Sequence, residues 1–501
     1  MKNNGFYTNL SRFGKNLLYR GYDHTGKRVS YKIPFKPTIY IPMADNLVTE
    51  YTSIFGGKVE PIQFDGMNEC RDFIKVYQGV KNFPIHGTTD YVAQYIQEQW
   101  PGKIPADETL INVCFLDIEV DTKGQGFPHA DQANFEVDVI GVKSNQSDKR
   151  YVWSLYSSYD ATKTELDIDP VNIVHTYCQT EIELLSEFLT WWNSREFSPD
   201  VVSGWNVQGF DIPYLYNRIR KVMGASKAKL MSPWGLIDTR TILNKFQKEI
   251  TVYDLKGIAT LDFMDVFIKF AHKYGPQENY KLDTIANTVL GTSKISYDEY
   301  SSLHELAARN PQKYIDYNIR DFDLVSEMND VTQLLSLVYT MAYRAGCNFT
   351  DAFGTTRIWD TIIYRDLISQ NIVVQPNEVK PAGEYEGAYV KEPIPGLRRW
   401  VASFDIASLY PSIIIEYNIS PETLQFDKML STSVNVCLDG TSFPDTHCVA
   451  ANGSMYSKEK QGSLPRLLEG FYAERQSIQQ QLATAEALHE QVKREMVRRG
   501  I

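Results

Sequence analysis

Two acidic residues, Asp117 and Glu119, stand near the end of a strongly apolar segment that runs from Leu110 to Val120. Residues two apart on a strand project from the same face, so one side of the predicted strand carries both carboxylates. An unpaired charge is costly in such surroundings, and shared divalent cations or basic partners would offset that cost. Because the chain holds 62 acidic residues, roughly eight acid-x-acid pairs arise by chance. The pair therefore needs support from other segments.

Two later segments carry further acids. Asp211 lies shortly before a predicted helix over 214–222, where an aspartate commonly caps the helix, and Asn206 reads as a turn residue. Tyr317 and Asp321 are four residues apart, so they share one face of a predicted helix. Taken alone, each segment is explained at least as well by ordinary capping or packing as by chemistry.

The elements around these acids alternate between strand and helix. Strands are expected at Val137–Val142, Arg150–Leu155 and Val201–Trp205, and one amphipathic helix is expected at Thr180–Trp192. This alternation predicts an α/β multidomain chain in which residues 109–333 form a domain with a mixed sheet. Short strands separated by turns precede it in a mixed α+β region, 1–108, and a helical and then extended segment follows, 334–376.

The C-terminal part reads differently. From Glu384 the sequence looks rich in strands, including Trp400–Phe404, and apolar residues keep helical spacing over 464–499. A helix of that length spans about 50 Å, and its apolar stripe requires a packing partner. Leu236–Gly257 reads as a hairpin that turns near Asn244–Gln247.

Composition limits the classes of protein. A chain of 501 residues with a net charge of −11 is a multidomain globular protein rather than a general nucleic-acid binder, although a local basic face remains compatible with DNA. The six cysteines form no CxxC pair, which argues against zinc and favours an intracellular setting. The sequence suggests neither a signal peptide nor a membrane span.

Together, the three acidic segments resemble the exonuclease motifs of proofreading DNA polymerases of the DnaQ-like kind. Those motifs read D-x-E, N-x₂₋₃-[FY]-D and Y-x₃-D, and they match Phe115–Val120, Asn206–Asp211 and Tyr317–Asp321. The second match is one residue longer than the strictest form. A run from Asp405 to Ser412, D-x₂-S-L-Y-P-S, is similar to motif A of B-family DNA polymerases. The likeness covers nearly the whole chain and is greatest to the T-even-like bacteriophage members.

This resemblance implies an RNase H-like exonuclease domain that removes nucleoside 5′-monophosphates from a frayed 3′ end of DNA. The carboxylates that would hold two Mg²⁺ or Mn²⁺ ions are those of Asp117, Glu119, Asp211 and Asp321. Tyr317 would orient the attacking water, and Asn206 would contact the terminal nucleotide. In this family a hairpin like the one over 236–257 helps to move the primer end, although an ordinary surface hairpin explains the segment equally well.

The resemblance also assigns residues to polymerisation. Asp405 would hold a metal that bridges the dNTP triphosphate and the primer end. The nucleotide-binding residues would be Ile406, Ser408, Leu409, Tyr410 and Arg475. Tyr385 and Gly387 match the family's Y-x-G-[GA] linker motif and would contact DNA. Gln479 stands where the family usually has a lysine, which puts nucleotide affinity in doubt.

Motif B and motif C of the family do not occur in these 501 residues. We therefore expect the N-terminal portion of a split or truncated polymerase, completed by a second polypeptide, that acts in the host cytoplasm if it is phage-encoded. Its expected parts are an N-terminal domain (1–108 and 334–376), an exonuclease domain (109–333), a partial palm (377–462) and one fingers helix (463–501). Two alternatives remain: a non-catalytic assembly half, and an artificial cut at residue 501.

Overall fold

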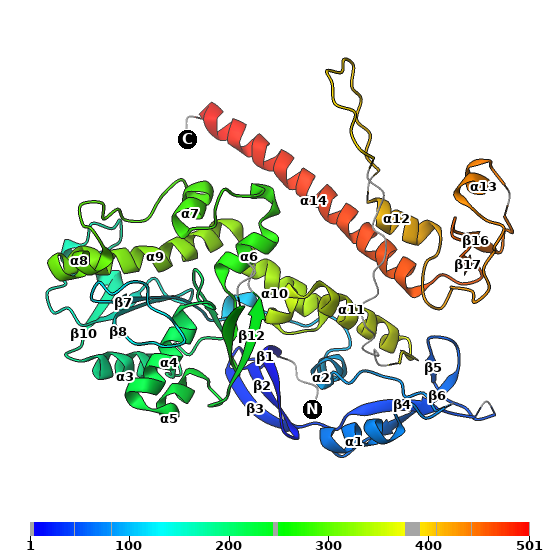
Figure 1. Cartoon of the computed structure of the whole chain (residues 1–501), viewed down its shortest axis with the longest axis horizontal. Helices are drawn as coiled ribbons and strands as arrows, with labels where there is room; N and C mark the ends of the chain where they lie inside the picture. The colour runs from blue at the N-terminus through cyan, green and yellow to red at the C-terminus, as the bar shows by residue number, and fades with distance from the viewer. Residues whose placement is uncertain are drawn as a thin grey trace. The chain divides into compact units, whose positions relative to one another are not determined.

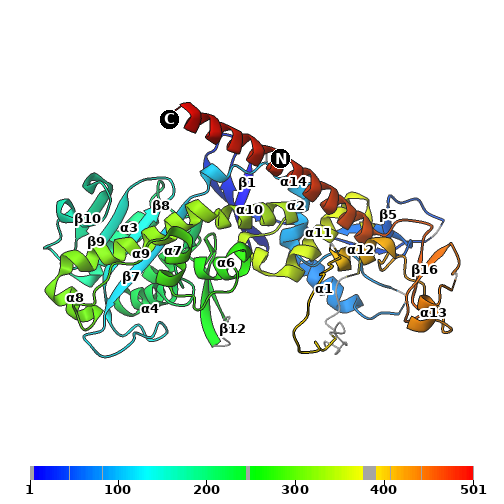
Figure 2. The ribbon, with the colours of Figure 1, turned by 90° about the horizontal axis from the view of Figure 1, so that it is seen from above.

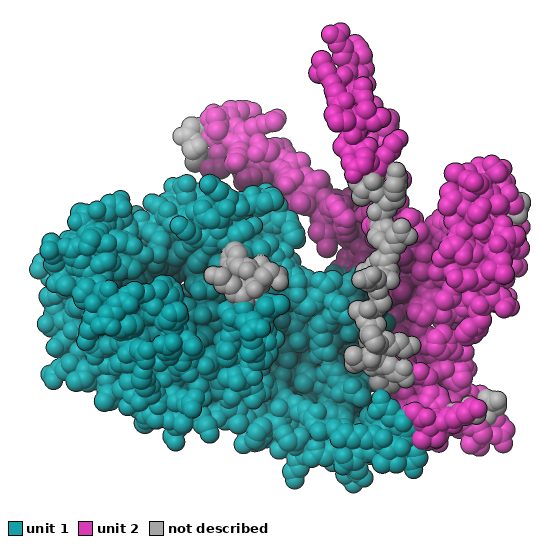
Figure 3. All heavy atoms as spheres, in the orientation of Figure 1, with its two compact units in different colours: residues 1–39, 62–78, 88–365 teal, residues 40–61, 79–87, 366–501 magenta. Residues whose placement is uncertain are grey.

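The computed structural model describes residues 5–44, 46–81, 83–243, 249–375, 391–406, 408–441 and 443–499. The contacts between its residues divide the chain into two compact units (Figure 3). Unit 1 comprises 1–39, 62–78 and 88–365, and unit 2 comprises 40–61, 79–87 and 366–501. The finer domain boundaries expected from the sequence stay predictions. Within the described ranges, no helix is long and apolar enough to cross a bilayer.

Unit 1 begins with a three-stranded antiparallel sheet, as the early turn signals predicted. Its strands are β1 (Phe6–Phe13), β2 (Asn16–Tyr22) and β3 (Arg28–Pro34), in the order β1-β2-β3. Two helices of the same unit follow in sequence, α1 (Met67–Tyr77) and α2 (Tyr91–Gln99). Asp90 begins α2 by accepting hydrogen bonds from the backbone N–H groups of Val92 and Ala93.

A buried carboxylate joins this small sheet to the central one. Asp200 accepts hydrogen bonds from the Tyr22 hydroxyl at 2.7 Å and the Asn112 backbone N–H at 3.0 Å. It also pairs with Arg28 at 3.1 Å and with Arg20, whose side chain is only 2% exposed, at 3.4 Å. Because one carboxylate binds groups that belong to both sheets or lie beside them, Asp200 fixes two sheets of unit 1 to each other.

The central sheet of unit 1 has six strands in the order β10-β9-β8-β7-β11-β14. Its strands are β7 (Val113–Asp121), β8 (Glu136–Ser144), β9 (Arg150–Ser154), β10 (Ile173–Tyr177), β11 (Val201–Ser203) and β14 (Ala259–Thr260). The pairs β7–β8 and β8–β9 are antiparallel, whereas β9–β10, β7–β11 and β11–β14 are parallel. The predicted mixed sheet is therefore confirmed.

Helices cover both faces of this sheet (Figures 1 and 2). On one face, α3 (Glu181–Trp192) and α4 (Asp211–Met223) pack against β7, β8 and β9 around an apolar core. On the other face, α9 (Pro311–Thr332) lies across β7, β8 and β9. A strand between two helical layers thus presents its alternate side chains to different surroundings.

The remaining helices of unit 1 extend this arrangement. They are α5 (Ala225–Ala228), α6 (Phe263–Phe270), α7 (Leu282–Leu290), α8 (Leu303–Arg309) and α10 (Leu334–Ala345), while α11 (Thr355–Ser369) runs on into unit 2. The predicted hairpin is confirmed by antiparallel pairing of β12 (Ile237–Leu243) with β13 (Glu249–Leu255). Its expected turn at Asn244–Gln247 lies outside the described residues.

Unit 2 holds most of a four-stranded sheet in the order β15-β5-β6-β4. Its strands are β4 (Thr38–Pro42), β5 (Tyr51–Ser53), β6 (Lys58–Gln63) and β15 (Ile372–Val373). The C-terminal part contributes α12 (Leu409–Glu416), α13 (Val434–Leu438), the hairpin of β16 (His447–Val449) with β17 (Met455–Ser457), and α14 (Ser463–Arg499). Helix α14 confirms the long helix expected over 464–499.

The predicted strand Trp400–Phe404 is wrong, because residues 391–406 form neither strand nor helix. Trp400 is 100% exposed and Phe404 is 94% exposed. A strand requires a neighbour to satisfy its N–H and C=O groups. No strand pairs with this segment among the described residues, so its β-propensity alone does not produce one.

Candidate active site

Successive side chains of β7 point to opposite faces of the sheet, which separates its acidic residues from its apolar ones. Leu116 and Ile118 point into the core beneath α3 and α4. Asp117 and Glu119 therefore project from the opposite face, toward α9. The predicted common face of the two carboxylates is thus confirmed, and the sheet supplies a rigid platform for both.

Helix α9 comes unusually close to the sheet above this pair. Gly141 on β8 is paired with Asp117 on β7. A Cβ at Gly141 would lie 2.1 Å from Asn318 Oδ1 and 2.4 Å from Phe322 Cε1, so only glycine leaves room for α9. The Asn318 side-chain amide donates to Asp117 Oδ2 at 2.7 Å, which orients that carboxylate.

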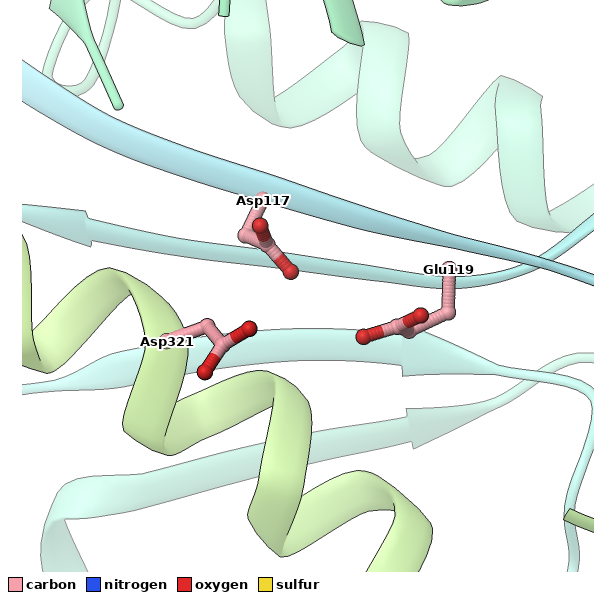
Figure 4. A group of neighbouring side chains, drawn as sticks. All are labelled: Asp117, Glu119 and Asp321. Atoms are coloured by element: carbon pink, nitrogen blue, oxygen red, sulfur yellow. The ribbon is translucent and has the colours of Figure 1, made fainter. Parts of the chain in front are cut away.

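The close approach brings Asp321 of α9 to Asp117 and Glu119. One carboxylate oxygen of each residue lies within 4.8 Å of the others, and the three groups converge in Figure 4. Asp321 Oδ1 is buried without a hydrogen-bond partner in the described part of the chain. Carboxylate oxygens are the ligands that hard divalent cations prefer. The residues present therefore fit such a cation.

Asp211 approaches the same group from the end of β11. It is the first residue of α4, and its Oδ1 accepts a hydrogen bond from the Ile118 backbone N–H on β7 at 3.1 Å. The capping interpretation is therefore not what the structure has, because α4 receives no hydrogen bond from a side-chain cap. Instead, this bond ties the Asp211 carboxylate to the strand that carries Asp117 and Glu119.

Lys294, which sequence reasoning missed, provides the positive charge at the site. Its ammonium lies 2.5 Å from Asp321 Oδ2 and 4.6 Å from the centroid of the Tyr317 ring. Tyr317 is 6% exposed, and its ring also meets the ring of Tyr297 edge-on at 5.6 Å. One turn of α9 thus carries both Tyr317 and Asp321 to the same ammonium group.

Burial is the main cause that raises the pKa values of all four carboxyl groups. The pKa values of Asp117 and Glu119 are raised well above normal, and the charge of Asp321 adds to the effect. Burial raises the pKa of Asp211 to about 7, against the opposing hydrogen bond from Ile118. It raises the pKa of Asp321 to about 6, against the opposing charge of Lys294. Without a bound cation, ionisation of all four carboxyl groups together is therefore unfavourable.

The hydroxyl of Tyr317 remains a hydrogen-bond donor. Burial, followed by the charge of Asp321, raises its pKa above the ordinary value. Burial alone would lower the pKa of Lys294, but the charge of Asp321 raises it. At neutral pH the site therefore presents one phenol O–H and one ammonium beside the carboxylates.

Aromatic and turn residues surround the carboxylates. The loop after β7 carries Phe127, which is 76% exposed and stands 5.7 Å, centroid to centroid, from Phe210. Phe210 directly precedes Asp211. Asn206 is exposed in the turn before α4, with a positive φ of 64°. The exposed ring of Phe127, next to the half-buried Phe210, is suited to a flat, stacking ligand.

The residues assigned to polymerisation do not converge in this way. Asp405, Ile406, Leu409, Tyr410 and Arg475 are exposed in unit 2, and Ser408 is partly buried. Asp405 therefore does not end a strand, contrary to expectation. It also joins no carboxylate cluster within the described ranges. Tyr385 and Gly387 lie outside the described residues.

Three supporting residues carried no motif that sequence reasoning could use. Lys294 lies in a loop after α7, and nothing in its neighbourhood marks a lysine as functional. Gly141 stands inside a strand, where a glycine signals a close approach without naming its partner. Asn318 occupies an unspecified position within the Tyr317–Asp321 motif, so only the contact with Asp117 reveals it.

Comparison with known proteins agrees with this geometry. Residues 89–285 match the model of the DNA polymerase family B exonuclease domain, and residues 354–496 match the model of DNA polymerase family B. A DNA-directed DNA polymerase of Escherichia phage RB69 is 31% identical over 94% of this chain and 53% of the relative. The DNA-directed DNA polymerase of Enterobacteria phage T4 is 28% identical over 98% of this chain and 55% of that relative.

A more distant relative, DNA polymerase 1 of Saccharolobus solfataricus, is 25% identical over 68% of this chain and 38% of its own length. The chain thus spans about half the length of the two phage relatives. Two models of one family match consecutive parts of the sequence, and the carboxylates of the first part meet in space. The chain belongs to DNA polymerase family B, and that family's exonuclease domain matches residues 89–285.

Proposed function

We propose that the exonuclease domain, residues 109–333, hydrolyses DNA from the 3′ end with two divalent cations. The observation that carries this proposal is the convergence of Asp117, Glu119 and Asp321 within 4.8 Å. Several buried carboxylates at such distances repel one another unless cations share their charge. Asp211, bonded to the same strand, completes the proposed ligand set.

Each side chain has a role in this proposal. Asp117, Glu119, Asp211 and Asp321 would hold two Mg²⁺ or Mn²⁺ ions. Such a pair of ions, when bound, turns a water molecule into hydroxide and stabilises the attacking and leaving oxygens. Tyr317 donates a hydrogen bond that orients the attacking water, and Lys294 offers its charge to the scissile phosphate.

DNA is the substrate that these surroundings favour. Bases of a single strand stack on exposed aromatic rings, and Phe127, which lies next to the half-buried Phe210 that precedes Asp211, offers such a ring. Asn206, exposed in the same turn, can donate to the terminal nucleotide. The reaction releases a nucleoside 5′-monophosphate from a frayed 3′ end.

We also infer that Asp405, Ile406, Ser408, Leu409, Tyr410 and Arg475 belong to a dNTP-binding polymerase site, with Tyr385 and Gly387 on DNA. Two-metal phosphoryl transfer needs more than the single carboxylate of Asp405. We therefore infer that DNA synthesis depends on the carboxylates of motif C, a motif that does not occur in residues 1–501. The second polypeptide expected to bring them stays a prediction, as does action in the host cytoplasm.

The decisive experiment is digestion of a 5′-labelled single-stranded oligonucleotide with Mg²⁺, with dNTP incorporation on a primer-template followed in parallel. The test variant is Asp117→Ala/Glu119→Ala. The matched control is Asp167→Ala/Asp169→Ala, which removes an exposed acid-x-acid pair from the same unit. We expect stepwise shortening from the 3′ end, a loss of several orders of magnitude in the test variant, and no change in the control.

The outcomes separate the alternatives. If the folded wild-type chain leaves DNA intact, the free-standing exonuclease proposal fails and the non-catalytic assembly alternative gains support. Equal losses in the test variant and the control would show that the acids act through overall charge. Incorporation of dNTPs by residues 1–501 alone would contradict the inference about the missing carboxylates.

A further inference from the structure

A buried aspartate outside the carboxylate cluster makes three hydrogen bonds to backbone. Asp262 follows β14 at the start of α6 and is 3% exposed. Its Oδ1 accepts from the backbone N–H groups of Asn206 and Met264, both at 3.1 Å. Its Oδ2 accepts from the backbone N–H of Gln208 at 3.0 Å. Only the bond to Met264 is an ordinary helix cap.

The other two bonds hold the turn that leads into Asp211. Asn206 has a left-handed φ of 64°, and its carbonyl accepts from the Phe210 N–H at 2.9 Å. Gly209 packs so tightly on Asn206 that a Cβ there would lie 2.5 Å from Asn206 Oδ1. A tight, unusual turn of this kind keeps its shape only when neighbouring groups fix it.

Both the carboxylate and the backbone of Asp211 are therefore held in place. Its carboxylate is fixed to β7 through the Ile118 N–H, and its backbone follows a turn fixed by Asp262. The residue after Asp262 is also bonded to the start of this turn, since the Phe263 N–H donates to the carbonyl of Gly204, which directly follows β11, at 2.9 Å. Loss of the Asp262 carboxylate would release two N–H groups of the turn at once.

We propose that Asp262 is a positioning residue of the exonuclease site, which keeps the Asp211 carboxylate in place to bind metal. The proposal rests on the proposed metal-dependent function. Asp262 acts through Asp211 and does not itself touch the reacting atoms. Outer residues that orient metal ligands commonly contribute about ten- to hundredfold to metal affinity.

The surroundings of Asp262 allow a chemical test of this role. Asp262, Gln208 and Thr260 line a cavity of about 640 Å³ within unit 1. A small anion can reach the place of the carboxylate through this cavity. In Asp262→Ala, added formate can therefore accept the released N–H groups of Asn206 and Gln208.

The experiment measures Mn²⁺ binding without DNA by electron paramagnetic resonance, at a temperature where each variant is folded. We expect Asp262→Ala to weaken Mn²⁺ binding about ten- to hundredfold and formate to restore part of it. Asp262→Asn, whose amide oxygen still accepts from N–H groups, should lose less. Because Asp262 acts through Asp211, Asp262→Ala should add nothing to the loss in Asp211→Ala.

Asp200→Asn is the matched control, since it also alters a buried carboxylate that accepts a backbone N–H in the same unit. It should lower stability and leave Mn²⁺ affinity unchanged. Unchanged affinity in Asp262→Ala, additivity with Asp211→Ala, or an equal loss in Asp200→Asn would overturn the proposal. If the wild type binds Mn²⁺ but does not digest DNA, the proposed function fails while the role of Asp262 is still decided.

Discussion

Gly141→Ala tests whether the closeness of α9 to the sheet is what makes the site. The added Cβ would lie 2.1 Å from Asn318 Oδ1 and 2.4 Å from Phe322 Cε1. Both side chains are fully buried, so neither has space to rotate away. Favourable carbon contacts lie near 3.5 Å, so α9 must retreat by about 1 Å.

The displacement of α9 should lower both the stability of the fold and the rate of the reaction, by different amounts. Overpacking of this kind costs about 1–3 kcal/mol of unfolding free energy. A displacement of about 1 Å at a catalytic group costs about a hundredfold in rate. Because α9 carries Tyr317 and Asp321, we expect the exonuclease rate to fall far more than the fraction of folded protein.

The assay combines initial rates on single-stranded DNA with urea unfolding of the same preparations. Gly102→Ala is the control, because Gly102 lies outside every helix and strand of unit 1, a Cβ there meets nothing within 4 Å, and its φ is not left-handed. We expect the control to match the wild type in both measurements. A wild-type rate in Gly141→Ala would refute the link between the helix position and the chemistry, whatever happens to stability.

Three further predictions concern charge. Lys294→Met removes the cation that opposes the burial of Asp321, so the pKa of Asp321 should rise above about 6; the acid limb of the pH–rate profile then moves to higher pH, and an unmoved limb would contradict this. Raised pKa values such as that of Asp211, about 7, mean that the metal-free fold binds more protons than the unfolded chain. In EDTA, the contribution of these groups to stability should therefore be greatest near pH 4 and decline toward pH 7. Melting curves at pH 8 should show that Mg²⁺ restores the lost stability. A stability in EDTA that does not change with pH would contradict this prediction. Asp200→Asn leaves the 2%-exposed Arg20 without its anion, which should cost about 3–5 kcal/mol in urea unfolding, whereas a loss below about 1 kcal/mol would show that water or other groups compensate.

Much of the framework follows from local sequence patterns. The period of two along β7 sets Asp117 and Glu119 on one face, and the period of four along α9 sets Tyr317 with Asp321. The hairpin of β12 with β13 and the helix α14 follow from patterns of the same kind. These features depend on residues close in sequence, which is why a single sequence reveals them.

Local patterns also mislead where a partner is required. The segment Trp400–Phe404 has the composition of a strand, yet no strand of the described residues pairs with it. Asp211 precedes a helix as a capping aspartate would, but its carboxylate bonds to β7 instead. For Asp211 the deciding group, the Ile118 N–H, is distant in sequence.

The sequence by itself predicted the four candidate exonuclease acids, and it determined the strand and helix that carry three of them and the family. Only the tertiary structure decided how these acids meet. Gly141 admits α9 to the sheet, Lys294 arrives from a separate loop to oppose the charge, and Asp262 holds the turn before Asp211. The physical reason is that periodicity fixes which face a side chain occupies, whereas contact between distant segments depends on packing that no local pattern encodes.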